Sequence, residues 1–159
     1  MGVTISHQYE SHRLRGGRVS VPGQIYHLRF SSYQQQALFL ELATVRCIIR
    51  ELQDAQPRQL ARTLAFVVMP DHVHWLCELG SKQSLGQVLG GVKARTARVL
   101  KANHGLQPPI WQSGYFDRAI REESQLVKVA RYIVANPLRK KLVEAIGDYP
   151  HWGAVFMDE

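Results

Sequence analysis

The sequence is poor in cysteine and lacks a long hydrophobic run. Its 159 residues contain two cysteines, Cys47 and Cys77, each in an apolar stretch. So few thiols do not predict a disulfide framework, and we expect both to be reduced core thiols in a cytoplasmic protein. No run approaches the roughly 18 apolar residues that a membrane-spanning helix needs, so no membrane partner is expected. Met1 to Gly17 is polar and basic without an apolar segment, which indicates no secretion signal.

Acidic residues are also scarce relative to basic ones. Thirteen Asp and Glu stand against twenty Lys and Arg, which gives a net charge of +7 and a pI near 9.7. A positive excess of this size favours an anionic polymer as partner, although a basic surface kept for solubility is the simpler alternative. With an ordinary apolar content of 45% and no internal repeat or linker, residues 1–159 are expected to form one domain.

Two histidines flank one apolar residue in the middle of the chain. His72 and His74 lie in a hydrophobic run that Pro70-Asp71 interrupts, which indicates a turn followed by a strand over Val73–Leu79. Side chains alternate faces along a strand, so both imidazoles are expected on one face, with His72 at the entry of the strand. Two imidazoles so placed are able to share one metal ion. Hydrogen bonding at a sheet edge is the alternative interpretation.

Hydrophobic periodicity predicts four strands and three helices. The strands are expected over Gln24–Ser31, Leu60–Met69, Val73–Leu79 and Trp111–Arg121. The helices are expected over Tyr33–Asp54, from the Ser84 N-cap to about Asn103, and over Glu122–Asn136 before Pro137. This order predicts an α+β fold with a ferredoxin-like antiparallel sheet of four strands, helices packed on one face and a further C-terminal helix. The first and third strands are adjacent in that topology, which puts His27 near the histidine pair.

The last predicted helix carries three polar residues in one row. Tyr132 and Asn136 are four residues apart, and Lys128 lies one turn before Tyr132 on the same flank. Such a row at the edge of the core is able to face a site. The alternative is a half-buried tyrosine at a helix edge, with Asn136 serving only as a helix stop before Pro137.

Taken together and in this order, the motifs resemble a known family. They are Met69-Pro-Asp-His-Val-His74, Trp111-Gln-Ser-Gly-Tyr-Phe-Asp-Arg-Ala-Ile-Arg121, Tyr132-Ile-Val-Ala-Asn-Pro-Leu-Arg-Lys-Lys-Leu-Val143 and Pro22-Gly-Gln-Ile-Tyr-His27. With them the chain resembles the single-tyrosine HUH transposases, and within that family the REP-associated tyrosine transposases. The resemblance covers a core of about residues 21–152. Leu138 stands where relatives commonly have valine, and Lys140-Lys141 where they commonly have alanine-glycine.

The resemblance implies an enzyme that cleaves and rejoins single-stranded DNA next to a hairpin. By position, His72 and His74 correspond to the metal-binding pair, Asn136 to the third metal ligand and Tyr132 to the nucleophile that forms a 5′-phosphotyrosine. The implied cofactor is a divalent metal, Mg²⁺ or Mn²⁺, and imidazole ligands favour Mn²⁺ somewhat. His27 and Lys128 are the expected supporting residues. Tyr115, in the strand motif, is the rival nucleophile.

Basic residues in two segments are the expected DNA-phosphate contacts, with a merely solvated face as the alternative. They are Lys93, Arg95, Arg98 and Lys101 on the second helix, and Arg139, Lys140 and Lys141 after the third. Trp111, Tyr115 and Phe116 are candidates for stacking on unpaired bases, although packing in the core explains them equally well.

Two other functions compete with the transposase interpretation. A protein of the same fold that binds nucleic-acid hairpins without cutting them has no need of the residue set formed by His72, His74, Tyr132 and Asn136. A small-molecule zinc hydrolase lacks an acidic partner at suitable spacing and leaves the basic charge unexplained. The long tail, with Trp152 and Phe156, favours a monomer by pinning the tyrosine helix to its own chain. A homodimer that exchanges this helix is the alternative.

Overall fold

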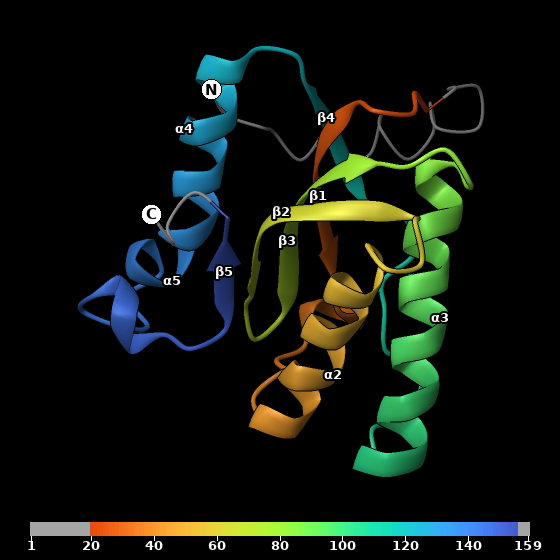
Figure 1. Ribbon diagram of the computed structural model, residues 1–159. Helices are drawn as coiled ribbons and strands as arrows, with labels where there is room; N and C mark the ends of the chain where they lie inside the picture. Colours follow the sequence, from red (N-terminus) through yellow and green to blue (C-terminus); the bar gives the residue numbers. More distant parts are fainter. Residues whose placement is uncertain (1–19, 156–159) are drawn as a thin grey trace.

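Within the described range, five strands form one antiparallel sheet (Figure 1). The structure, a computed structural model, describes residues 20–155, so the predicted role of Phe156 lies outside it. Across the sheet the strands follow the order β4-β1-β3-β2-β5. They are β1 (Ile25–Ser31), β2 (Ala61–Val68), β3 (His72–Leu79), β4 (Phe116–Ile120) and β5 (Trp152–Ala154).

The α+β class and the ferredoxin-like order of the first four strands are confirmed, but the prediction of a four-stranded sheet was wrong by one strand. The additional strand, β5, pairs with β2 and places Ala154 opposite Ala65. Its central residue, Gly153, lies against an aromatic ring, since a Cβ added there would come within 2.7 Å of Phe66 Cε1. A three-residue strand centred on glycine carries no period-two signal, which is why the pattern did not predict it.

Helices cover both faces of the sheet (Figure 1). α2 (Leu42–Asp54) and α3 (Leu85–His104) pack on one face, and α4 (Glu123–Val134) packs on the other. A short helix, α5 (Asn136–Arg139), follows α4. Two 3₁₀ turns, Tyr33–Gln35 and Ile146–Asp148, complete the described elements. The prediction of two helices on one face, followed by a further C-terminal helix, is thus confirmed, whereas the face that this last helix covers was not predicted.

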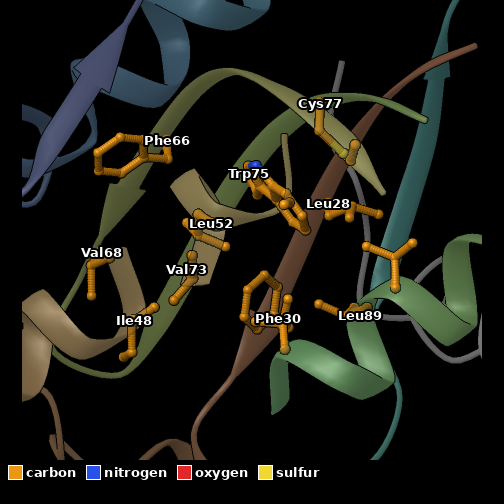
Figure 2. Close-up of a cluster of buried hydrophobic side chains, with 14 of the residues drawn as sticks. Leu28, Phe30, Ile48, Leu52, Phe66, Val68, Val73, Trp75, Cys77 and Leu89 are labelled. Carbon is orange, nitrogen blue, oxygen red and sulfur yellow. The ribbon is translucent and has the colours of Figure 1, made fainter. Parts of the chain in front are cut away.

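The larger core lies between the sheet and the α2–α3 layer (Figure 2). The strand residues Leu28, Phe30 and Trp75 point into it and are fully buried. Ile48 and Leu89 meet them from α2 and α3. Because successive residues of a strand alternate faces, this core fixes which side chains of β1 and β3 point the other way.

The first predicted helix begins nine residues later than expected, at Leu42 rather than Tyr33. Gln34 and Gln35 have positive φ values of 54° and 55°, which no α-helix accommodates. The side-chain hydroxyl of Ser32 donates to the carbonyl of Gln36 at 2.6 Å, and the Phe39 N–H donates to the Pro70 carbonyl at 3.0 Å. These contacts hold the segment in a non-helical path that buries the Phe39 ring.

α3 confirms its predicted boundaries closely. Ser84 and Gln87 form a capping box, and Gly105 adopts the left-handed conformation with φ 68° at the helix end.

Both cysteines are free, and Cys77 is fully buried in the core. Of the helices in the described range, none has the length and apolarity to cross a bilayer.

Candidate active site

Strand register gathers the histidines on the sheet face opposite the larger core. Residues that pair directly across antiparallel strands share a face. β1 pairs with β3 so that Arg29 lies opposite His74 and Ser31 lies opposite His72. His27, two residues before Arg29, projects from the same face. The predicted proximity of His27 to the histidine pair is confirmed, since its Nε2 lies 2.8 Å from Nδ1 of His74.

Each histidine of the pair uses the same ring nitrogen for a protein contact. His72 Nδ1 lies 2.7 Å from Oδ1 of Asp71, and His74 Nδ1 contacts His27. The two ring centroids are 5.1 Å apart. Within residues 20–155, Nε2 of neither ring makes a hydrogen bond. When Nδ1 contacts a protein group and Nε2 has no protein partner, the imidazole is oriented to bind a metal ion through Nε2.

Burial keeps these imidazoles neutral at physiological pH. Burial is the largest cause of the lowered pKa of His27, which falls to about 4, and the charges of Arg118 and Arg29 lower it further. Burial likewise lowers the pKa of His72, an effect partly offset by the hydrogen bond that His72 donates to the Asp71 carboxylate. Burial also lowers the pKa of His74 well below its ordinary value. A neutral imidazole has a free lone pair, which is the form that binds a metal ion.

Tyr132 stands beside the histidines in the same chain. Its ring centroid lies 6.1 Å from that of His74 and 6.5 Å from that of His27. The side chain is 51% exposed, so the phenol is open to a bound substrate. Arg139 covers the ring face, with Cζ 3.8 Å from the centroid, and its Nη1 donates to the Tyr132 carbonyl at 2.8 Å. The last turn of α4 and the side chain of Arg139 therefore fix the position of the ring.

Asn136 lies one turn further on, but not in a continuous helix as predicted. α4 ends at Val134, and α5 starts at Asn136 after a bend at Ala135. Asn136 is buried, at 3% exposure, whereas Tyr132 is half exposed. The amide of Asn136 makes no side-chain hydrogen bond with the described residues.

The basic residues at the end of α5 and directly after it lie close to the histidines. Lys140 contributes to the lowered pKa of His72, and Arg139 contributes to that of His74. Both side chains, with Lys141, are exposed. This predicted cationic segment therefore borders the site.

The basic residues of α3 do not gather there, because α3 covers the opposite sheet face. Two of them are held within the chain instead of being free for phosphate. Lys93 Nζ donates to the carbonyls of Gln112 and Gly114, at 3.0 and 2.6 Å. Arg95 Nε lies 2.8 Å from a carboxylate oxygen of Glu51. Arg98 and Lys101 are exposed on the same helix.

Two other predicted site residues lie away from the histidines. Tyr115 packs partly buried against the larger core, with its hydroxyl beside Gly86 of α3. It is on the wrong face to act as nucleophile at His72 and His74. Lys128 is exposed on α4, and within residues 20–155 no contact joins it to the histidines.

The aromatic residues proposed for base stacking divide between the two faces. Trp111 packs against Phe30 and Phe39, and its indole N–H donates to the Thr96 hydroxyl at 2.9 Å, so it belongs to the core. The Phe116 ring centroid lies 6.4 Å from that of His27, on the histidine face.

Sequence reasoning missed three residues of the site: Asp71, Arg29 and Arg118. Asp71 directly precedes His72 and was interpreted only as part of the turn. Arg29 shares the face of His27 by strand alternation, and Arg118 pairs with His27 across β1 and β4. Period-two counting from His27 identifies Arg29, whereas Arg118 needs the strand register.

Comparisons with known proteins point in one direction. A family model described as "Transposase IS200 like" matches residues 20–136, which is more than two thirds of the chain. A curated Haemophilus influenzae protein, named as a candidate REP-associated tyrosine transposase, is 27% identical over 99 residues, covering 56% of each chain. An uncharacterised protein of the same organism is 24% identical over 95 residues, covering 46% of this chain and 52% of its own. The chain thus spans about half the length of the curated relatives it matches.

Solved structures share the fold. A REP-associated tyrosine transposase bound to a REP hairpin superposes with a TM-score of 0.71 at 19% identity, covering 85% of this chain and 79% of that one. A candidate transposase from Deinococcus radiodurans gives a TM-score of 0.54 at 22% identity, covering 74% and 93% of the two chains. The extent of the family match, together with the ordered motifs and this fold, establishes that the chain belongs to the IS200-like transposase family.

Proposed function

We propose that this protein is a metal-dependent endonuclease and strand transferase that cleaves single-stranded DNA beside a hairpin. The observation that carries the proposal is the position of Tyr132, whose ring centroid lies 6.1 Å from that of His74 in the same chain. A solvent-open phenol next to two neutral imidazoles with free Nε2 atoms is the arrangement that tyrosine-mediated phosphoryl transfer requires.

The proposed metal ligands are Nε2 of His72, Nε2 of His74 and the amide oxygen of Asn136. Within the described residues no three His, Cys, Asp or Glu side chains are arranged to hold a metal ion. Asn136, four residues after Tyr132, is therefore the proposed third donor. Two nitrogen donors and one oxygen donor suit Mn²⁺ or Mg²⁺. When bound, such an ion supplies Lewis acidity to a phosphate oxygen. Asp71 and His27 orient the two imidazoles through their contacts with Nδ1 of His72 and Nδ1 of His74.

Tyr132 carries the proposed covalent step. Its hydroxyl oxygen attacks phosphorus, the phenol proton passes to solvent, and the bond from phosphorus to the 3′ oxygen breaks. The departing oxygen takes up a proton and becomes a free 3′-hydroxyl, while the 5′-phosphate stays on the tyrosine. Because one phosphodiester replaces another, a 3′-hydroxyl is able to reverse the step and join strands without an external energy source.

Hairpin DNA is the proposed partner. The solved relative of the same fold is bound to a REP hairpin. In this chain the exposed cations Arg139, Lys140 and Lys141 border the histidine site and are the proposed backbone contacts beside the scissile phosphate. The test is a denaturing gel of protein, Mn²⁺ and a hairpin oligonucleotide with a single-stranded flank, in which a protein–DNA adduct is expected. Binding without an adduct, even with metal present, indicates the non-cleaving alternative.

Asp71→Ala is expected to weaken Mn²⁺ binding by about 10–100-fold, because the partner that orients His72 is lost. Isothermal titration calorimetry of the free protein measures this affinity. Asp148→Ala, which removes an exposed carboxylate in the turn Ile146–Asp148, is the matched control and should bind as the wild type does. Equal affinities for all three proteins would remove Asp71 from the proposed site.

We further propose that the protein is a cytoplasmic monomer with one domain over residues 1–159. Both cysteines are free, which suits a reducing compartment. Ile133 of α4 and Ala154 of β5 share one core cluster, and Tyr132 already faces the histidines of its own chain. No exchanged helix is therefore needed to complete the site. Sedimentation equilibrium should give the monomer mass of 18.1 kDa, and a stable dimer would contradict this proposal.

A further inference from the structure

Arg29 occupies a central place in the proposed site. It lies on β1 opposite His74 on one side and opposite Phe116 of β4 on the other. Directly paired residues of an antiparallel sheet have Cβ atoms about 5 Å apart. The side chain therefore starts beside the imidazole of His74 and shares its face.

The guanidinium of Arg29 has no protein partner within residues 20–155. The side chain is only partly exposed, yet no described hydrogen bond or ion pair engages it. Arginine at a sheet surface ordinarily finds a carboxylate, as Arg62 does with Glu78 at 3.2 Å on the same face. Five N–H donors next to the histidines are consequently left for something else.

The charge around Arg29 identifies what that ligand is. Arg29 lies opposite His74, and Arg139 lies over the Tyr132 ring, with Cζ 3.8 Å from its centroid. Within residues 20–155 the carboxylate in contact with the histidine pair is Asp71, 2.7 Å from His72 Nδ1. Arg118 adds a further cation beside His27. Together with a divalent ion, this excess of positive charge is costly unless an anion enters. A planar guanidinium is able to bind a phosphate through two parallel N–H···O hydrogen bonds, and phosphate is the anionic group of nucleic acid.

Resting on the proposed function, we propose that Arg29 is the phosphate-binding residue inside the site, contacting non-bridging oxygens of the DNA strand where it crosses the histidine face. Arg29 holds the strand over His74 so that Tyr132 meets a fixed phosphorus atom. This role differs from that of Arg139 to Lys141, which lie at the border of the site and follow the backbone outside it.

Binding of single-stranded DNA without metal tests the proposal independently of cleavage. Fluorescence anisotropy of a labelled oligothymidylate is measured in EDTA over a salt series for the wild type, Arg29→Gln, Arg29→Lys and the matched control Arg62→Gln. Arg29→Gln should bind about tenfold more weakly, as expected for the loss of a charge-assisted contact. Its dependence of log K on log salt should be shallower by about 0.7, which corresponds to one phosphate.

The variants separate charge from geometry. Arg29→Lys should recover the salt slope but not the full affinity, because lysine keeps the charge and loses the bidentate fork. Arg62→Gln should match the wild type, and circular dichroism confirms that each variant is folded. Wild-type affinity and slope for Arg29→Gln, or no binding by the wild type at low salt, would overturn the proposal. If Arg29→Gln binds weakly while the wild type forms no adduct with metal, the phosphate role stands and the proposed cleavage fails.

Discussion

Tyr132→Phe is expected to abolish the covalent protein–DNA adduct. The substitution removes one oxygen atom and keeps the ring that packs beside His27 and His74 and under Arg139. The fold and DNA binding should therefore stay intact. Loss of a nucleophile lowers the rate by about 10³-fold or more, which brings the adduct to background. Denaturing gels of protein with a labelled hairpin oligonucleotide and Mn²⁺ measure it.

Tyr115→Phe is the matched control for that experiment. It removes the same atom from a tyrosine on the other face of the sheet, packed against α3. Adduct formation should be close to that of the wild type. An adduct that survives Tyr132→Phe and disappears with Tyr115→Phe would move the nucleophile and require a different site.

His74→Ala should eliminate both metal binding and cleavage. His74 is 5% exposed, and its ring connects His27 to the metal position through the Nδ1 contact of 2.8 Å. Removing it takes away one metal donor and leaves His27 without its partner. We expect a loss of Mn²⁺ affinity of about 100-fold or more and no detectable adduct. Calorimetry with Mn²⁺ and the same gel assay measure the two effects.

His104→Ala is the corresponding control, since His104 ends α3 on the opposite face and should be neutral in both assays. Both the enzyme and the non-cleaving alternative should bind a hairpin, so metal affinity and adduct formation are the measurements that separate them. If the wild type binds a hairpin but His74→Ala changes neither metal affinity nor any activity, the histidines are structural and the protein is a binding module.

The histidine face was predictable because it depends on local alternation. A strand needs only its own sequence to fix which residues share a face, so the grouping of His72 with His74 required no tertiary knowledge. The position of His27 required one further step, the neighbouring order of β1 and β3. Each of these predictions was confirmed by the register of the two strands.

The parts that failed depend on contacts between distant segments. The predicted start of the first helix at Tyr33 was too early, because Ser32 and Phe39 donate hydrogen bonds to the turn around Pro70, which is distant in the sequence. The prediction of one continuous helix to Asn136 was wrong because Ala135, with φ −82° and ψ −3°, separates α4 from α5. The two carbonyls of the loop before β4 that accept from Lys93 Nζ were not foreseen either, and a DNA contact of Lys93 stays a prediction from charge alone. Periodicity contains none of this information.

Crystals of the protein soaked with Mn²⁺ test the central claim most directly, because manganese has a measurable anomalous signal. We predict a single strong peak on the histidine face, with Nε2 of His72, Nε2 of His74 and the amide oxygen of Asn136 as its protein ligands and Tyr132 beside it. A peak elsewhere, or a histidine face without metal at saturating Mn²⁺, would contradict the account.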